Sequence, residues 1–132
     1  MEYSSFGAVR VYQGEKSGKY PDGNQVIVQG AELRVAFDTP RVSRVIGADL
    51  DGVDLVILGH VHEDHVVALG RLTRARVQVH EADLAAAQSW SGLSRHYGYP
   101  PEVLAVLRPI IERDFHYQPR PDATAYADGA TW

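Results

Sequence analysis

Residues 53–58, Val-Asp-Leu-Val-Ile-Leu, are apolar at every position but one and do not alternate with polar residues. A short strand of this composition is buried on both of its faces, which happens when other layers cover both sides of the sheet. Segments with the apolar periodicity of helices follow it along the chain. The sequence therefore predicts an α/β fold with this strand at the centre of a mixed sheet and with helices packed on the sheet.

A cluster of possible metal ligands comes directly after this strand. Residues 60–65, His-Val-His-Glu-Asp-His, contain three imidazoles and two carboxylates. In an extended segment His60 and His62 point the same way and can reach one ion, and Asp64 follows in parity. If a helix begins at Asp64 instead, Asp64 and His65 lie on its first turn and can reach a second ion about 3.5–4 Å from the first.

The donor types in this cluster decide which metals suit it. Neutral imidazole and carboxylate are ligands of zinc, iron and manganese, and the sequence has no cysteine that would add a thiolate. A single histidine is more often a structural residue than a ligand. Three histidines and an aspartate at the end of a buried strand would, however, be costly to leave unpaired. We therefore predict that His60, His62, Asp64 and His65 bind one or two metal ions.

The pattern His60-x-His62-x-Asp64-His65 after an apolar strand resembles the signature of the metallo-beta-lactamase superfamily. This superfamily includes beta-lactamases, glyoxalase II type thioesterases, lactonases and tRNA 3′-processing nucleases. Residues 23–28 and 33–40 are similar to the opening hairpin of the family. The resemblance implies a binuclear site, zinc being the expected metal, in which His60 and His62 hold the first ion and Asp64 and His65 hold the second.

The resemblance also implies an activity, that of a metal-dependent hydrolase. Water activated at the binuclear site would attack an ester, thioester, lactone or phosphodiester in a small-molecule substrate, and Asp64 would orient the attacking water. Mononuclear iron chemistry is a variant of this hypothesis, because two histidines and a carboxylate suffice for it. The alternative is a half-domain that binds metal or a partner without catalysis.

The resemblance covers nearly all of this chain but only the N-terminal half of the family's αββα sandwich. The later family ligands have no counterpart, because His80, His96 and His116 stand alone in other contexts. We therefore expect a single domain over residues 1–132, truncated before the second half of the fold. Such a half exposes an edge strand, so we expect it to pair with a second copy of itself or with the missing C-terminal half.

Two single positions and one short segment depart from the family pattern. Gly59 stands where the family has Thr or Ser, and Pro40 stands where it has Gly. Residues 66–69, Val-Val-Ala-Leu, replace the usual Ile-Gly-Gly-Leu. The loss of two glycines after His65 could tighten the backbone over the metals.

Charge and hydropathy exclude several classes of partner. The net charge is -4, with 13 basic and 17 acidic residues in no long run, which argues against nucleic acid. No apolar run approaches the length of about 20 residues that a membrane span needs, and the N-terminus lacks the pattern of a signal peptide. We therefore expect a cytoplasmic protein.

Periodicity and turn residues predict the remaining elements. Strands are expected over residues 6–12, 25–28, 33–37 and 76–80. Helices are expected over residues 41–46, 66–74 and 81–90 and from Pro101 onward, the last with a kink near Leu107 caused by Pro109. Loops are expected over residues 14–24, 49–52 and 94–101, and residues 116–132 show little periodicity.

A few polar residues allow two interpretations. Asp38 either caps the backbone of residues 39–42 or orients a metal-bound histidine. For His80 we favour a cap on residues 81–83 over a metal ligand. The loop at residues 14–24 is expected to be a plain surface turn, although Lys16, Lys19 and Tyr20 are candidates for substrate contact.

Overall fold

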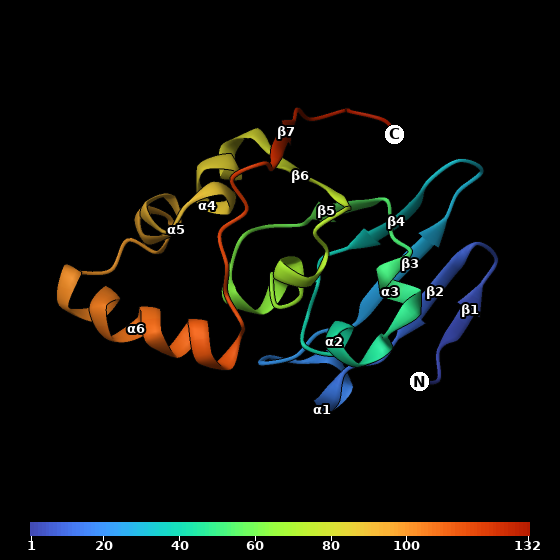
Figure 1. The fold of residues 1–132 in the computed structure, drawn as a ribbon, viewed down its shortest axis with the longest axis horizontal. Helices are drawn as coiled ribbons and strands as arrows, with labels where there is room; N and C mark the ends of the chain where they lie inside the picture. Colours follow the sequence, from blue (N-terminus) through green and yellow to red (C-terminus); the bar gives the residue numbers. More distant parts are fainter.

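The computed structural model describes residues 1–132 and contains one seven-stranded mixed sheet (Figure 1). The strands lie in the sheet in the order of the chain. Neighbouring strands from β1 to β4 are antiparallel, and those from β4 to β7 are parallel. The strands are β1 Ser4–Phe6, β2 Val9–Tyr12, β3 Gln25–Gln29, β4 Arg34–Phe37, β5 Leu55–Leu58, β6 Arg76–His80 and β7 Thr124–Tyr126.

Short helices connect these strands and a longer helical group lies beyond β6. In Figure 1, α2 and α3 lie in front of the sheet, and α4, α5 and α6 form the end of the molecule away from β1. The helices are α1 Glu15–Gly18, α2 Ser43–Ile46, α3 Ala48–Asp51, α4 Leu84–Gln88, α5 Trp90–Tyr97 and α6 Pro101–Asp114. The 3-10 turns are η1 Glu63–His65, η2 Leu69–Arg71 and η3 Glu81–Asp83.

Strand β5 has the central, two-sided burial that its composition predicts. All four of its residues are buried, and it pairs in parallel with β4 on one side and β6 on the other. Val56 and Leu58 belong to the main core, together with Leu50 of α3 and Leu93 of α5. The α/β class and the mixed sheet are confirmed.

The predicted helix over residues 66–74 is wrong. The segment contains only the 3-10 turn η2, although Val66, Val67 and Leu69 are buried. Thr39 accounts for the difference, because its carbonyl oxygen accepts the N–H of Val67 at 2.8 Å and its hydroxyl accepts that of Ala68 at 3.3 Å. These backbone groups therefore pair with the end of β4 rather than with a helical turn.

Other boundaries also differ from the predictions. The single strand expected over residues 6–12 is a hairpin of β1 and β2, residues 49–52 belong mostly to α3, and α6 runs without a break through Pro109. Residues 116–132 include β7, which pairs with β6. The helix expected over residues 81–90 breaks at Ser89, whose side chain accepts the N–H of Gly92 and starts α5, so residues 94–97 are helical rather than loop.

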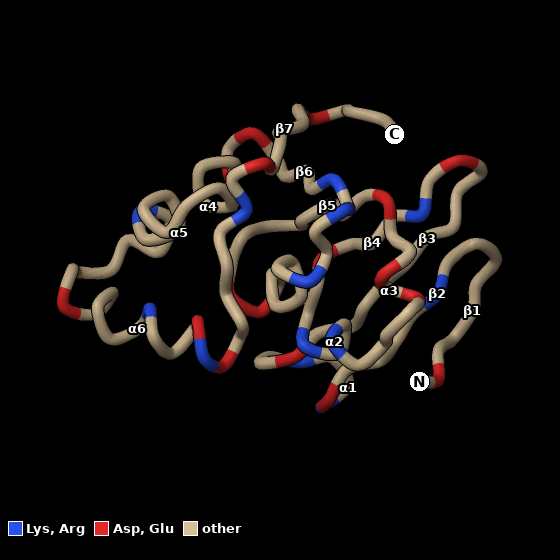
Figure 2. Tube along the Cα trace, in the orientation of Figure 1, with Lys and Arg blue, Asp and Glu red and all other residues tan.

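Charged residues are distributed along the whole chain. Figure 2 shows acidic and basic positions interspersed, with the central strand β5 free of both. The six helices include none that combines the length and the apolar composition needed to cross a bilayer.

Gly92 tests how closely α4 and α5 pack. A Cβ atom at this position would lie 1.8 Å from the carbonyl oxygen of Ala85, so Gly92→Ala must push the two helices apart. We expect a loss of about 1–3 kcal/mol in the free energy of unfolding, measured with urea. The control is Gly52→Ala, where the nearest atom would lie at 3.8 Å and a change within about 0.5 kcal/mol is expected. Equal effects of the two substitutions would contradict the tight packing.

Candidate functional site

The carboxyl ends of β4, β5 and β6 meet at one edge of the sheet because these strands are parallel. Asp38 follows β4, the histidine cluster follows β5, and His80 ends β6. Polar side chains from different strands therefore converge at this edge, which is where open α/β sheets commonly place ligands.

The structure brings the three predicted histidines together. The ring centroids of His60 and His65 lie 3.9 Å apart, and those of His60 and His62 lie 4.8 Å apart. Oδ2 of Asp64 lies 3.7 Å from Nε2 of His65. Neither a purely extended segment nor a helix describes residues 60–65, because the chain turns into η1 at Glu63.

The candidate metal ligands lie close together at this edge, but their side chains are not arranged around a common point. No group of three or more His, Asp or Glu side chains converges closely enough to hold an ion. Three imidazoles and a carboxylate within one small cluster nevertheless have the donor chemistry that zinc requires. The cluster therefore fits a metal by the chemistry of its donors.

Asp38 connects the histidine cluster to the end of β4. Its Oδ2 lies 2.9 Å from Nδ1 of His65, and its Oδ1 accepts the N–H of Gly59 at 2.7 Å. The expected cap on residues 39–42 is instead supplied by Asp22, which accepts the N–H of Val42. Of the two interpretations of Asp38, the structure supports the one in which it orients a histidine.

The pKa values of two histidines shift in opposite directions. Burial lowers the pKa of His60, and the neighbouring His65 and His62 lower it further. For His65, burial also acts to lower the pKa, but Asp38, Asp64 and Glu63 outweigh it and raise the pKa above its ordinary value. The lowered pKa of His60 favours the neutral imidazole that a metal ligand needs, whereas the raised pKa of His65 favours its protonated form, which must lose a proton before it can bind an ion.

Backbone hydrogen bonds fix the turn that carries His65. The N–H of Thr39 donates to the carbonyl oxygen of His65 at 2.9 Å, and the Thr39 hydroxyl donates to the same oxygen at 3.2 Å. The N–H of His65 in turn donates to the carbonyl oxygen of His62. The end of β4 therefore holds the turn after β5 in place.

Two tyrosines clamp Glu63, a residue that the sequence pattern left without a role. Tyr20 donates to Oε1 at 3.0 Å, and Tyr97 donates to Oε2 at 2.5 Å. Although burial acts to raise the pKa of Glu63, these hydrogen bonds and the neighbouring His62 lower it overall. Burial and the same carboxylate raise the pKa of Tyr20 to about 12 and that of Tyr97 even further.

Tyr97 also contacts His62 directly. The two rings are stacked, with centroids 5.4 Å apart and an angle of 5° between their planes. The ring of His96 lies 5.5 Å from that of His62. In the sequence, His96 and Tyr97 stand out only as members of an aromatic segment. Nothing in that segment indicated that α5 would bring these two residues to the histidine cluster.

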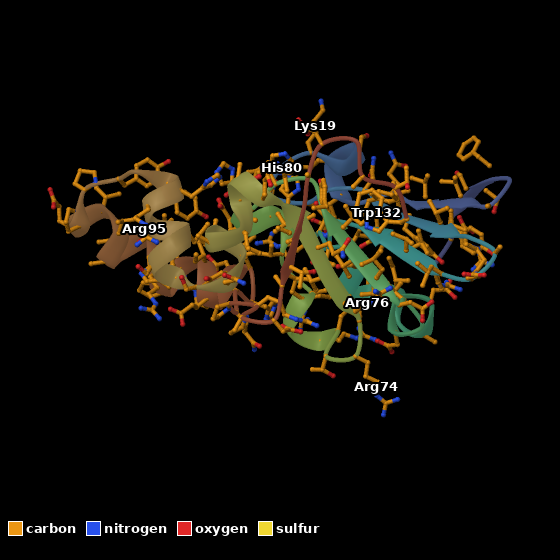
Figure 3. The ribbon with its side chains drawn as sticks, turned by 90° about the horizontal axis from the view of Figure 1, so that it is seen from above. Lys19, Arg74, Arg76, His80, Arg95 and Trp132 are labelled. Atoms are coloured by element: carbon orange, nitrogen blue, oxygen red, sulfur yellow. The ribbon has the colours of Figure 1, made fainter.

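The remaining candidate residues lie away from the cluster or only cap backbone. His80 accepts the N–H of Ala82 at 3.1 Å and pairs with Asp128, which confirms its predicted capping role. Lys19 points outward from the molecule in Figure 3. In the loop at residues 14–24, Tyr20 is thus the candidate for which the structure records a contact with the cluster, through Glu63.

Substitution of Asp38 in the metal-free protein tests whether this residue raises the pKa of His65. In Asp38→Asn, the amide oxygen can still accept the N–H of Gly59, and asparagine tolerates the positive φ of 58° at this position. We expect the pKa of His65 to fall, measured by NMR titration of the histidine rings. The ring signals of His116, which follows α6 outside the cluster, serve as the internal control and should be unaffected by the substitution.

The same substitution should alter the pH dependence of stability. A raised pKa of His65 stabilises the fold below the unfolded value of about 6.5, and this contribution is lost as the pH rises through the folded-state pKa. The stability difference between the two proteins should therefore be larger near pH 5 than near pH 8. A constant difference would mean that Asp38 does not hold a charged His65.

Comparisons with known proteins identify the fold. No family model matches the sequence, and no curated protein matches it either. A metallo-beta-lactamase superfamily protein from Sulfolobus tokodaii superposes with a TM-score of 0.64 and 16% identity, over 90% of this chain and 48% of that one. A subclass B3 metallo-beta-lactamase from a soil metagenome library gives a TM-score of 0.58 and 19% identity, over 97% and 46%.

A dizinc quorum-quenching lactonase gives a TM-score of 0.52 and 13% identity, over 99% of this chain and 62% of that one. This chain spans about half the length of the first two structures. At these identities the similarity concerns the fold. The sequence resemblance is therefore confirmed at that level, and the chain has the metallo-beta-lactamase fold over roughly half the length of the solved structures that share it.

Proposed function

We propose that this chain carries the metal-binding half of a metal-dependent hydrolase of the metallo-beta-lactamase superfamily. The observation that supports the proposal most is the clustering of His60, His62 and His65 beside Asp64 at the carboxyl end of β5. The solved structures with this fold include beta-lactamases and a lactonase.

The four candidate ligands divide into two pairs. His60 and His62 would hold one ion, and Asp64 and His65 would hold a second, with zinc as the first choice and iron or manganese as alternatives. The chemistry that bound zinc supplies is a lowered pKa for water and polarisation of a carbonyl or phosphoryl oxygen.

The residues of this chain prepare the cluster in several ways. The lowered pKa of His60 favours a free nitrogen lone pair at neutral pH. Asp38 orients His65 through the ion pair at Nδ1, as carboxylates beside metal-binding histidines do. Asp64 is the proposed catalytic residue, since its carboxylate can accept a hydrogen bond from the attacking water and so orient it.

A pocket beside the cluster supports a small-molecule substrate. It has a volume of about 340 Å³ and includes Asp38 and Gly59 in its wall. Its apolar lining comes from Phe37, Ile57 and Trp132 among others. We keep an ester, thioester, lactone or phosphodiester as the proposed substrate class. In proteins that share a fold, the substrate is set by the site and its pocket and not by the fold itself.

A second candidate function is metal binding without turnover. It is favoured by the sequence after the cluster, because His80, His96 and His116 stand in contexts unlike the later ligand motifs that the resemblance implies. The two functions share the same ligands, and they differ only in whether zinc-loaded protein turns over substrate.

Metal content tests the ligand assignment. Zinc-loaded protein should retain about one or two equivalents after desalting, measured by plasma mass spectrometry. The double variant His62→Ala, Asp64→Ala should lose this zinc. His116→Asn is the matched control, because it removes a histidine outside the cluster at a position whose positive φ of 53° asparagine tolerates. Zinc that is absent from the unmodified chain, or unchanged in the double variant, would refute the site.

Hydrolysis assays test the catalytic half of the proposal. With thioester, lactone and phosphodiester substrates, we expect turnover that a chelator abolishes and added zinc restores. Asp64→Asn should lower the rate at least about 100-fold, because the group that orients water is weakened. Glu32→Gln, at an exposed position before the start of β4 and so at the opposite end of that strand from Asp38, should leave the rate unchanged. Zinc binding without hydrolysis of any substrate would establish the non-catalytic function instead.

A further inference from the structure

The rings of His65 and His62 have different supports. His65 has a carboxylate partner, because Oδ2 of Asp38 lies 2.9 Å from its Nδ1. His62 has aromatic partners, and its ring is stacked on that of Tyr97 with an angle of 5° between the two planes. A parallel neighbour limits the tilt of an imidazole only as far as that neighbour is itself held in place. The orientation of His62 therefore depends on what holds Tyr97.

The backbone of Tyr97 is fixed by helix α5, of which it is the last residue. Leu93, one helical turn earlier, is fully buried in the main core. The N–H of Gly98 closes the helix end by donating to the carbonyl oxygen of Ser94 at 3.1 Å. The ring of Tyr99 also stacks on the ring of Tyr97, with centroids 5.7 Å apart. Helix α5 thus places Tyr97 beside the cluster, while the ring can still turn about its side-chain bonds.

The carboxylate of Glu63 fixes the far end of the Tyr97 side chain. The hydroxyl of Tyr97 donates to Oε2 of Glu63 at 2.5 Å, and the hydroxyl of Tyr20 donates to Oε1 at 3.0 Å. Hydrogen bonds to a carboxylate are shorter and stronger than those between neutral groups. The ring of Tyr20 packs in turn against that of Phe115, with centroids 5.9 Å apart. The carboxylate is therefore held from two sides.

These contacts do more than link the loop at residues 14–24 to α5. Glu63 directly follows His62 in the chain, at the start of η1. The residue that fixes Tyr97 is thus the neighbour of the histidine on which Tyr97 stacks. A peptide bond, a hydrogen bond and a ring stack join His62, Glu63 and Tyr97 into a closed circuit, in which each member restricts the other two.

We propose that Glu63 is a positioning residue, which holds the ring of Tyr97 against His62 and so keeps the His62 imidazole in one orientation for metal binding. The part that concerns metal rests on the proposed function, whereas the orientation of the ring is measurable without metal. Asp38 acts on His65 through an ion pair, and Glu63 acts on His62 through the tyrosine ring. Residues that orient metal-binding histidines typically change metal affinity about 10–100-fold when they are substituted.

Tyr97→Phe tests the proposal, because it removes the hydroxyl that Glu63 holds and leaves the ring. Tyr117→Phe is the matched control, since the hydroxyl of Tyr117 is buried without a hydrogen-bond partner and its removal breaks no contact of Glu63. The first measurement is the nuclear Overhauser effect between the rings of residues 62 and 97, made by NMR on the metal-free proteins. We expect this effect to weaken several-fold in Tyr97→Phe and to stay unchanged in Tyr117→Phe.

An internal reference separates a local change from a general loosening of the fold. The rings of His80 and Tyr126 lie 5.8 Å apart at the end of β6, outside the circuit around Glu63. Their nuclear Overhauser effect should be the same in all the proteins. A merely structural role of Glu63 would weaken both effects together or neither of them.

Zinc affinity is the second measurement, made by competition with a chromogenic chelator. The zinc Kd of Tyr97→Phe should rise about 10-fold, and that of Tyr117→Phe should not change. An unmodified chain that binds no zinc would refute the proposed function, and the NMR comparison would then decide by itself whether Glu63 orients His62.

Glu63→Ala covers the case in which Tyr97→Phe does not fold, as judged by circular dichroism. It removes the carboxylate and leaves both tyrosines, so it should weaken the same contact between residues 62 and 97. An unchanged contact in the folded variant, or an equal loss in Tyr117→Phe, would overturn the proposal. A weakened contact with an unchanged zinc Kd would also overturn it, because the orientation of His62 would then have no effect on metal binding.

Discussion

The parallel pairing of β5 with β4 and β6 is the constraint on which the rest of the structure depends. It buries all four residues of β5 and brings the ends of the three strands to one edge. The polar residues directly after these strands therefore lie close to one another, and no long loop is needed to bring them together. Thr39, at the end of β4, completes the arrangement by holding the backbone of His65 with two hydrogen bonds. The position of the histidine cluster is thus set by the sheet.

The sequence was informative wherever local composition decides structure. The apolar segment before the histidines predicted β5, and the strand over residues 76–80 coincides with β6. It failed where distant backbone groups decide the structure. In the helix expected over residues 66–74, the N–H groups of Val67 and Ala68 pair instead with Thr39, 28 and 29 positions earlier. Strand β7 was missed for the same reason, since a three-residue strand with little periodicity is defined by its pairing with β6.

The candidate site shows the same division. The motif alone predicted which histidines lie together, because they belong to one short segment. It could not predict the clamp on Glu63, whose partners Tyr20 and Tyr97 are 43 and 34 residues away. Asp38 allowed two interpretations in the sequence, and only the distance to His65 distinguishes them.

The compactness of the histidine cluster in the sequence has a consequence for the order of folding. Four candidate ligands come from six consecutive residues, so bringing them together closes almost no loop and costs little chain entropy. Asp38 and Tyr97, by contrast, reach the cluster only after β4 and α5 have docked. An ion could therefore associate with the segment after β5 while the chain is still largely unfolded, and the later contacts would then select the orientation of ligands already gathered.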